Sequence, residues 1–255
     1  MGKSEIPQVA IVDFGLGNLF SVRHACEHGG LQANITSLKK DILGADAVIL
    51  PGVGAFGDAM GALRKLDLIS PLRDAAASKI PLIGICLGMQ LLMRESFEFG
   101  RYEGLGLIDG AVLPLDNPFE SFRRLKVPHV GWNRIYHPGA AAQTSGGGLS
   151  RDGGWLDSPL AGLNEGEFMY FVHSYYAEPD QYDLALSKTR YGDVEFCSSF
   201  RKDNLFAFQF HPERSGRFGL KIYENLACLI QESKDTLKQS GADGFQGAPS
   251  VLSKR

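Results

Sequence analysis

The sequence predicts an α/β protein with a mostly parallel central sheet flanked by helices and a more antiparallel, strand-rich second half. In the first third of the chain, short apolar segments alternate with amphipathic ones, as strands alternate with helices in a parallel sheet. With 255 residues, 44% of them hydrophobic and 22% charged, the chain can bury one sizeable core. The formal net charge of −3 and the absence of a Lys/Arg-rich run argue against nucleic acid as a partner.

The first half provides the strands of the predicted parallel sheet. Continuous apolar strands of this kind are typical of a sheet covered on both faces, with functional sites at the carboxyl ends of its strands. Two such ends are Pro51–Gly54 (PGVG) and Cys86. The predicted strands are Gln8–Asp13, Ala33–Thr36, Ala47–Leu50 and Pro81–Cys86, and the predicted helices are Leu19–His28 (begun near Asn18), Asp58–Leu66 and Ile69–Ser78.

The second half consists of apolar strands separated by turns and closed by a helix over Phe218–Glu232. We expect residues 1–239 to form a single domain, because apolar patterns run throughout them. Residues 139–154 are small and polar and predict a mobile surface insertion, and residues 240–255 predict a disordered tail. The predicted strands are Val127–Tyr136, Glu167–Tyr176, Leu184–Thr189, Val194–Phe200 and Leu205–Phe210.

The cysteine usage and the start of the chain indicate a cytoplasmic protein. Four widely separated cysteines without a CxxC pair are typical of a reduced, intracellular chain. Cys26, Cys197 and Cys228 lie in apolar patterns and are interpreted as small buried hydrophobic residues. The first residues lack the apolar segment of a secretory signal, and no apolar stretch approaches the roughly 20 residues that span a bilayer.

Cys86 stands in the pattern of a nucleophile elbow, with cysteine in place of serine. The apolar strand PLIGI precedes it, the helical run LGMQLLMRE follows it, and Gly84 and Gly88 leave room for a sharp turn. The turn would place the sulfur at the positive end of a helix, which favours the thiolate, and free the Leu87 N–H to face an oxyanion. The alternative interpretation is a small buried cysteine without chemistry.

A cysteine nucleophile needs a base, and the base needs a group that orients it. The buried-strand pattern Leu205–Phe210 runs directly into His211-Pro212-Glu213. Pro212 disfavours a helical His211, and residues two apart in an extended chain share a face, so Glu213 can reach the imidazole. Among the other histidines, His24, His28 and His137 show no pattern of chemistry.

Metal and nucleotide sites receive little support from the sequence. No His/Cys cluster has zinc-like spacing, so we expect no metal. Gly15-Leu16-Gly17 follows a strand, but Phe20 replaces the third glycine of a dinucleotide-binding fingerprint. The P-loop pattern is also absent from the sequence, and no cofactor is expected.

Four motifs occur together in this chain, PGVGAFGDAM, GICLGMQLL, FVHSYY and FQFHPERSG. With them the chain resembles the class I (triad) glutamine amidotransferases. Within that family, VDFGLGN, PGVGAFG and KVPHVGWN (Lys126–Asn133) are most similar to the glutaminase subunits of imidazole glycerol phosphate synthase, an enzyme of histidine biosynthesis. The resemblance covers about Val9 to Leu229, nearly the whole predicted domain.

The resemblance implies a role for each residue of a Cys86–His211–Glu213 triad: Cys86 would form a glutamyl thioester, His211 would transfer protons and Glu213 would orient His211. It also implies an ammonia-using partner, a (β/α)₈ cyclase subunit that forms a heterodimer with this chain. The implied oxyanion hole comes from the backbone of Val53, Gly54 and Leu87, the implied glutamine site from Gly54, Gln90, His173 and Ser174, and the implied partner-facing residues are Trp132, Tyr170 and Arg214.

Several alternatives remain open at this point. Arg214 stands where the family usually has lysine, and residues 95–110 (ESFEFGRYEGLGLIDG) resemble a paralogous branch that supplies ammonia to sugar-modifying enzymes of surface polysaccharide synthesis. A stand-alone cysteine hydrolase of γ-glutamyl compounds is a second alternative. A non-catalytic partner is disfavoured, because all three triad residues are present. From the residues alone, His173 and the rings of Trp132 and Tyr170 fit core packing as well as function.

Overall fold

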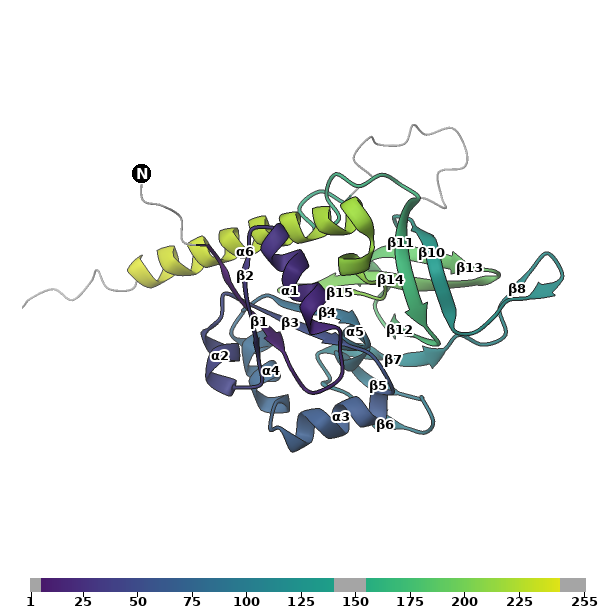
Figure 1. The fold of residues 1–255 in the computed structure, drawn as a ribbon, viewed down its shortest axis with the longest axis horizontal. Coiled ribbons are helices and arrows are strands. Elements are labelled where there is room, and N and C mark those ends of the chain that lie inside the picture. The colour runs from purple at the N-terminus through teal and green to yellow at the C-terminus, as the bar shows by residue number, and fades with distance from the viewer. Residues whose placement is uncertain (1–5, 140–154, 244–255) are drawn as a thin grey trace, which may run out of the picture.

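The computed structural model describes residues 6–139 and 155–243, and Figure 1 shows their arrangement. The first half alternates strands and helices as the sequence predicts. In chain order it contains β1 (Gln8–Val12), α1 (Leu19–His28), β2 (Gln32–Thr36), α2 (Lys39–Gly44), β3 (Ala47–Gly52), α3 (Phe56–Lys65), α4 (Ile69–Ala77), β4 (Leu82–Cys86) and α5 (Leu87–Leu91).

The centre of the fold is a seven-stranded sheet in the order β13-β14-β15-β4-β3-β1-β2. The pairs β1–β2, β1–β3, β3–β4 and β4–β15 are parallel, and only β13–β14 and β14–β15 are antiparallel. This confirms the predicted α/β class with a mostly parallel central sheet. It also shows that the strands β13 (Ala185–Tyr191), β14 (Val194–Lys202) and β15 (Leu205–Phe208) extend the central sheet from the second half of the chain.

Both faces of the sheet are covered by helices. Alternate residues of each strand point to opposite sides and therefore pack in different core clusters. Val9 and Ile11 of β1 contribute to one core cluster with α1 and α6 (Gly216–Asp243), whereas Ala10 and Val12 contribute to the other with α2, α3, α4 and α5. Figure 1 shows α1 and α6 on the upper side of the sheet and α2, α3 and α4 on the lower side. The strands therefore have the continuous apolar sequences that made them recognisable.

Antiparallel pairing dominates the rest of the second half, as predicted. Its elements are β5 (Met93–Ser96), β6 (Tyr102–Glu103), β7 (Ile108–Pro114), β8 (Phe119–Glu120), β9 (Arg123–Arg124), β10 (His129–Ile135), β11 (Glu167–His173), β12 (Tyr175–Pro179), η2 (Tyr182–Leu184) and η3 (Pro212–Arg214). They form a four-stranded sheet β12-β7-β5-β6, the pair β10–β11 and the hairpin β8–β9, which projects from one side of the molecule in Figure 1. Within the four-stranded sheet, β5 and β7 are parallel and the other pairs are antiparallel.

Two predicted elements are corrected by long-range contacts. The helical run predicted after Cys86 ends at Leu91. The carbonyls of Leu91 and Leu92 accept hydrogen bonds from the N–H groups of Leu105 and Leu107, at 2.8 and 3.0 Å, and so are not available to a further helical turn. The predicted strand Glu167–Tyr176 is in fact two strands, β11 and β12, which pair with different neighbours on either side of Ser174. Helix α2 and strands β5 to β9 were not predicted.

Helix α6 is longer than predicted. It continues past Glu232 to Asp243, and Lys234 Nζ lies 2.7 Å from Asp46 Oδ2, an ion pair that ties its later turns to the sheet. Residues 240–243 are therefore helical and do not belong to the predicted disordered tail. The rest of that tail (244–255) and positions 140–154 of the predicted insertion lie outside the described residues. Within the described ranges, neither α6 nor any other helix combines the length and apolar character needed to cross a membrane.

The junction of β4 and α5 is packed backbone against backbone. A Cβ on Gly88 would overlap the carbonyl oxygen of Leu50 in β3, and a Cβ on Gly84 would lie 2.8 Å from the backbone nitrogen of Met89. Contacts this close exclude any side chain. The two glycines of the predicted elbow are thus required for close approach, as the sequence indicated.

We expect Gly88→Ala to destabilise the fold. The added methyl group must displace β3 or α5, and overpacking of this kind costs about 1–3 kcal/mol, or several degrees in Tm for a chain of this size. Gly61→Ala is the matched control, because Gly61 lies within α3 with open space around its Cα, and alanine favours a helix over glycine by about 1 kcal/mol. Thermal unfolding followed by circular dichroism measures both. A Gly88→Ala protein as stable as Gly61→Ala would contradict this packing.

Candidate active site

A cavity of about 250 Å³ opens at the carboxyl ends of β3 and β4. Cys86 is the last residue of β4 and pairs with Gly52, the last residue of β3. The structure brings together at this cavity every residue predicted for the oxyanion hole and the glutamine site. Its lining residues are Val53, Gly54, Cys86, Leu87, Gln90, Glu98, Pro128, Val172, His173, Ser174 and Tyr175.

Cys86 has an unusual backbone conformation, with φ 54° and ψ −109°. Such a conformation costs a residue other than glycine roughly 1–3 kcal/mol, and it persists only where the surroundings impose it. Here β4 on one side and the tightly packed α5 on the other impose it. The residue is 6% exposed, at the wall of the cavity. This is the geometry of a nucleophile elbow, although α5 has only five residues and its dipole is smaller than the predicted helical run would give.

His211 and Glu213 form the expected pair. His211 Nδ1 lies 2.7 Å from Glu213 Oε1, and the two side chains are 7% and 2% exposed. The sequence argument was correct about His211, which has extended backbone angles, but wrong about Glu213, which lies in the single turn of η3. The turn still brings the carboxylate to the imidazole, because the chain bends back immediately after Pro212.

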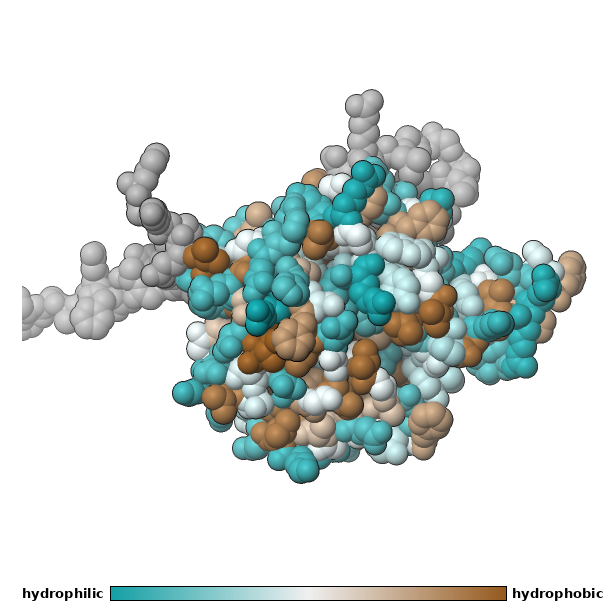
Figure 2. All heavy atoms as spheres, viewed as in Figure 1, coloured by the Kyte–Doolittle hydropathy of each residue, from teal (hydrophilic) through white to brown (hydrophobic). Residues whose placement is uncertain are grey.

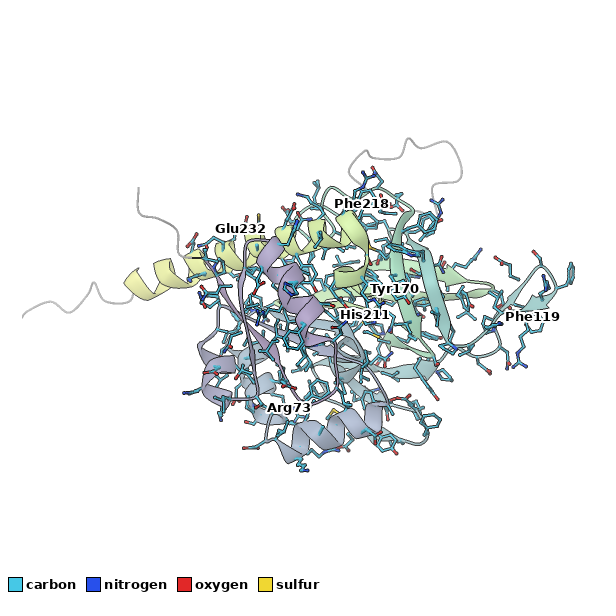
Figure 3. The ribbon with its side chains drawn as sticks, viewed as in Figure 1. Arg73, Phe119, Tyr170, His211, Phe218 and Glu232 are labelled. Atoms are coloured by element: carbon cyan, nitrogen blue, oxygen red, sulfur yellow. The ribbon has the colours of Figure 1, made fainter. Side chains whose placement is uncertain are left out.

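The backbone around His211 is held by β11. The His211 N–H donates to the Tyr170 carbonyl at 2.9 Å, and the Ser215 hydroxyl donates to the His211 carbonyl at 2.6 Å. The same hydroxyl oxygen accepts from the Tyr170 N–H at 3.0 Å. Figure 3 shows Tyr170 and His211 close together where β11 meets the end of β15. Ser215 thus links the backbone of His211 to β11, the strand that forms another wall of the site.

The charge state of His211 follows from its neighbours. Burial alone lowers the pKa of His211, but the negative charge of Cys86, the hydrogen bonds and the Glu213 carboxylate together raise it to about 10. The charge of Cys86 is the largest of the causes that raise this pKa, and among the described residues His211 Nε2 has no hydrogen-bond partner of ordinary geometry. The His211 ring is therefore held as an imidazolium at neutral pH.

His173 lines the cavity, as the glutamine-site prediction requires, and its ring is also buried with hydrogen-bond partners, as expected of a core histidine. Its Nδ1 lies 2.9 Å from the Tyr175 carbonyl, which can only accept, and its Nε2 lies 3.1 Å from Nδ1 of His129. His129 Nε2 in turn lies 3.3 Å from the Asn133 amide nitrogen. Burial lowers the pKa of His173 to about 3 and that of His129 to about 4, so both rings are neutral.

Two residues of the cavity wall, Glu98 and Tyr175, were not among the predicted site residues, although both lie in segments that the sequence analysis quoted. Glu98 is buried and accepts the Phe56 N–H at 2.5 Å, at the start of α3, and burial raises its pKa. Tyr175 contributes its backbone carbonyl, which receives hydrogen bonds from His173 and, at 2.8 Å, from Gln90 Nε2. A third missed residue, Gln209, lies behind Cys86. Two signals could have found it: it is a single amide within the apolar strand LFAFQF, and it lies in the motif FQFHPERSG.

The three predicted partner-facing residues form one cluster on the surface. Trp132 and Tyr170 are directly opposite each other on β10 and β11, with ring centroids 6.0 Å apart, and the Arg214 guanidinium lies 4.9 Å from the Tyr170 ring centroid. Trp132 is 55% exposed, so the core-packing alternative is wrong for this ring. Figure 2 shows hydrophobic residues exposed among hydrophilic ones on the face seen there, below α1 and beside the β10–β11 pair.

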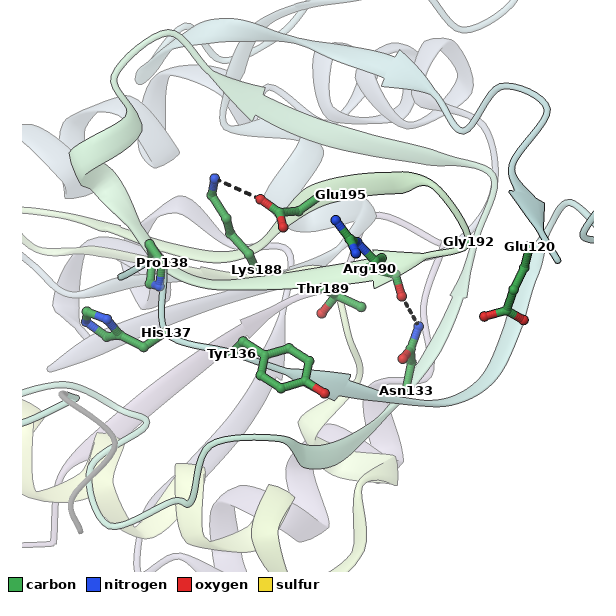
Figure 4. Close-up of a pocket in the computed structure, with 10 residues that line it drawn as sticks. All are labelled: Glu120, Asn133, Tyr136, His137, Pro138, Lys188, Thr189, Arg190, Gly192 and Glu195. Atoms are coloured by element: carbon green, nitrogen blue, oxygen red, sulfur yellow. Dashed lines mark hydrogen bonds and ion pairs between the residues drawn. The ribbon is translucent and has the colours of Figure 1, made fainter. Parts of the chain in front are cut away.

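A second cavity, of about 450 Å³, lies between β10 and β13, on the side of β10 where Asn133 points (Figure 4). Asn133 donates to the Arg190 carbonyl at 2.9 Å, and Lys188 pairs with Glu195 at 3.2 Å across its wall. Neither Cys86 nor His211 lines this cavity. It is larger than the cavity at Cys86, but no cysteine is among the described residues that line it.

The remaining cysteines carry no comparable chemistry. Cys26 and Cys197 are buried as predicted, and burial raises the pKa of each thiol to about 12. Cys228 is exposed, so its assignment to the core was wrong: it lies on a face of α6 that the sheet does not cover. Within the ranges that the structure describes, no group of three His, Cys, Asp or Glu side chains is arranged to hold a metal ion.

Comparison with known proteins gives consistent matches. The model of the family Glutamine amidotransferase class-I matches residues 10–228. The imidazole glycerol phosphate synthase subunit HisH of Rhodopirellula baltica is 42% identical over 224 residues, which cover 88% of this chain and 98% of that protein. Its counterpart in Sulfurimonas denitrificans is 45% identical over 219 residues, covering 85% and 96%.

Among solved structures, a putative GMP synthase protein from Thermoplasma acidophilum matches with a TM-score of 0.62 and 16% identity, covering 92% of this chain and 98% of that chain. PurLQS from Thermotoga maritima matches with a TM-score of 0.61 and 19% identity, covering 89% and 100%. At such identities the agreement concerns the fold, which these proteins share with this chain.

The charge state of His211 can be tested directly. Cys86→Ser removes the leading cause that raises the pKa of His211, so the pKa should fall from about 10, and Glu213→Gln should lower it by less. NMR titration of histidine-labelled protein measures this: at pH 8 the His211 ring should be protonated in the wild type, and its titration midpoint should be lower in Cys86→Ser. Cys228→Ser, an exposed change in α6, is the control and should leave the titration unchanged. An unaltered His211 titration in Cys86→Ser would show that no thiolate faces the ring.

Proposed function

The chain belongs to the class I glutamine amidotransferase family, and from that premise we propose that it is the glutaminase subunit of imidazole glycerol phosphate synthase. It hydrolyses glutamine to glutamate and ammonia for histidine biosynthesis. The observation that carries the assignment is the strained Cys86 at the wall of the cavity, with the 2.7 Å His211–Glu213 pair beside it. The two relatives, both synthase subunits, favour this pathway over the surface-sugar branch.

The geometry supports acyl transfer in two steps. The Cys86 thiolate attacks the side-chain amide carbon of glutamine, and the carbonyl oxygen takes up the negative charge. The His211 imidazolium then gives its Nε2 proton to the departing nitrogen, so that ammonia leaves and a glutamyl thioester remains. The neutral imidazole removes a proton from water, the resulting hydroxide attacks the thioester, and collapse releases glutamate and restores the thiolate–imidazolium pair. Glu213 keeps Nε2 aimed at the reacting atoms throughout.

The oxyanion needs donors in place. The Leu87 N–H is the first of α5, and the first N–H groups of a helix have no partner within it. We assign the second donor to the backbone at Val53–Gly54, which lines the same cavity. Gly54 has φ +105° with open space around its Cα, and Val53 is 43% exposed, so little packing holds this peptide in one orientation. Gln90, His173 and Ser174 form the remaining wall that would hold glutamine.

The proposed partner is a (β/α)₈ cyclase subunit, which forms a heterodimer with this chain in the cytoplasm. The exposed cluster of Trp132, Tyr170 and Arg214 is its proposed docking surface. Tyr170 lies on this surface and its carbonyl holds His211, so the surface is directly connected to the catalytic base. Ammonia that leaves Cys86 would pass to the partner while it is still unprotonated and nucleophilic.

Cys86→Ser should abolish synthesis driven by glutamine and spare synthesis supplied with ammonium. The reason is that Cys86 opens the amide but takes no part in the reaction of the acceptor. The complex reconstituted with the cyclase is assayed with each nitrogen source, with Cys228→Ser as the control that should behave as wild type. Glutamine-driven activity within a few-fold of wild type would exclude Cys86 as the nucleophile.

The isolated chain should be a poor glutaminase that the partner with bound acceptor activates by about 10²–10³-fold, the rate effect of one oxyanion donor. One orientation of the Val53–Gly54 peptide offers an N–H to the oxyanion and the other offers a carbonyl, and binding energy need only shift this balance by a few kcal/mol. Glutamate release is measured for the chain alone, with the cyclase, and with the cyclase and acceptor. Equal turnover in all three would favour the stand-alone hydrolase of γ-glutamyl compounds.

A further inference from the structure

We propose that Gln209 is a catalytic residue: its side-chain N–H holds the Cys86 sulfur as a thiolate and links it to Gln90 in the wall of the cavity. The proposal rests on the function assigned above, because it gives Gln209 a role in the reactivity of that same nucleophile. Triad chemistry as described so far does not use this residue.

Gln209 is fully buried directly behind the nucleophile. Its Nε2 lies 3.8 Å from Cys86 Sγ, within reach of an N–H···S hydrogen bond, and its Oε1 lies 3.2 Å from Gln90 Nε2. The backbone fixes its position: β15 pairs with β4 so that Phe208 lies opposite Ile85, and the Gln209 N–H donates to the Ser198 carbonyl at 2.9 Å. The next residues of both strands, Gln209 and Cys86, are therefore neighbours.

The orientation of the Gln209 amide follows from that of Gln90, which the Tyr175 carbonyl fixes. The Tyr175 carbonyl can only accept, so the Gln90 atom 2.8 Å from it must be the amide nitrogen. That same nitrogen faces Gln209, whose nearest atom must then be the oxygen. The Gln209 amide nitrogen is left pointing at Cys86, and the sulfur receives a donor.

A donor at this place acts on the protonation of the sulfur. The Val172 carbonyl lies 3.8 Å from Sγ on β11 and can accept only from a thiol, so it favours the protonated form. Gln209 has the opposite effect, because hydrogen bonds donated to a charged group stabilise that group. The attraction of His211 and the hydrogen bond from the Gln209 N–H both favour the thiolate, whereas the Val172 carbonyl favours the thiol.

Glutamine is the side chain that fits both contacts. A buried amide donates to the sulfur and accepts from Gln90 without adding charge. A carboxylate of the same shape would still accept from Gln90 but would place a negative oxygen against the sulfur. Replacing the amide by a carboxylate therefore keeps the contact with Gln90 and changes only the contact with Cys86, which distinguishes a role toward the sulfur from a role in packing.

The test uses the pH dependence of Cys86 alkylation by iodoacetamide in the isolated chain, carrying Cys228→Ser so that the exposed cysteine does not react. Gln209→Glu should raise the pH midpoint of alkylation by one unit or more and slow alkylation at pH 7 by about 10- to 100-fold, the effect of losing a hydrogen bond to a charged group. Gln209→Leu, which removes the donor without adding charge, should shift the midpoint in the same direction by less. Gln181→Glu, which adds the same charge at an exposed position, should leave it unchanged.

The outcomes distinguish this proposal from the assigned function. A wild-type midpoint in folded Gln209→Glu and Gln209→Leu would overturn it and leave Gln209 a packing residue that satisfies Gln90. Should Gln209→Glu fail to fold, as its thermal unfolding would show, Gln209→Leu alone decides. Alkylation needs neither glutamine nor a partner, so a shifted midpoint together with a complex that cannot use glutamine would refute the function while the role of Gln209 toward the sulfur stands.

Discussion

The rest of the site depends on one backbone constraint, the positive φ of Cys86 at the junction of β4 and α5. The chain must reverse there within one residue, so that Cys86 lines the cavity at the end of the sheet although it also packs in the core. The reversal is possible only because Gly88 lets α5 lie directly on the backbone of Leu50, and because β4 is central, with both faces buried. Tight packing behind the nucleophile thus offsets the free-energy cost of this backbone conformation.

The sheet order then brings the base to the nucleophile. β15 is the parallel neighbour of β4, although most of the second half of the chain separates them in sequence. Because parallel strands end at the same edge, the chain leaving β15 delivers His211 and Gln209 beside Cys86. β11 closes the other side, where the Tyr170 carbonyl and Ser215 hold the His211 backbone. The nucleophile and the base are therefore positioned by three strands, β4, β15 and β11, each with its own hydrogen-bonded neighbours in a sheet.

The sequence predicted those features that are determined locally. Helix α1 was predicted to begin near Asn18, and in the structure the Asn18 side chain accepts from the Ser21 N–H at 3.4 Å. The elbow and His-Pro-Glu motifs pointed to the triad. Features set by distant partners were not predictable in this way. α5 stops early because residues near Leu105 capture its carbonyls, Cys228 is exposed because no sheet covers its side of α6, and Glu98 reaches the cavity only through the start of α3.

The pKa values of two buried histidines of this site are shifted in opposite directions, and the difference follows from their neighbours. Around His173 the partners are a carbonyl and the neutral His129 ring, which do not offset the loss of water, so its pKa falls to about 3. Around His211 the partners are the Glu213 carboxylate and Cys86, and its pKa rises to about 10. Had His173 been charged as well, a second cation at the cavity wall would compete with His211 for the thiolate and repel the imidazolium that must protonate the leaving nitrogen. With His173 neutral, the proton for the departing ammonia comes from His211.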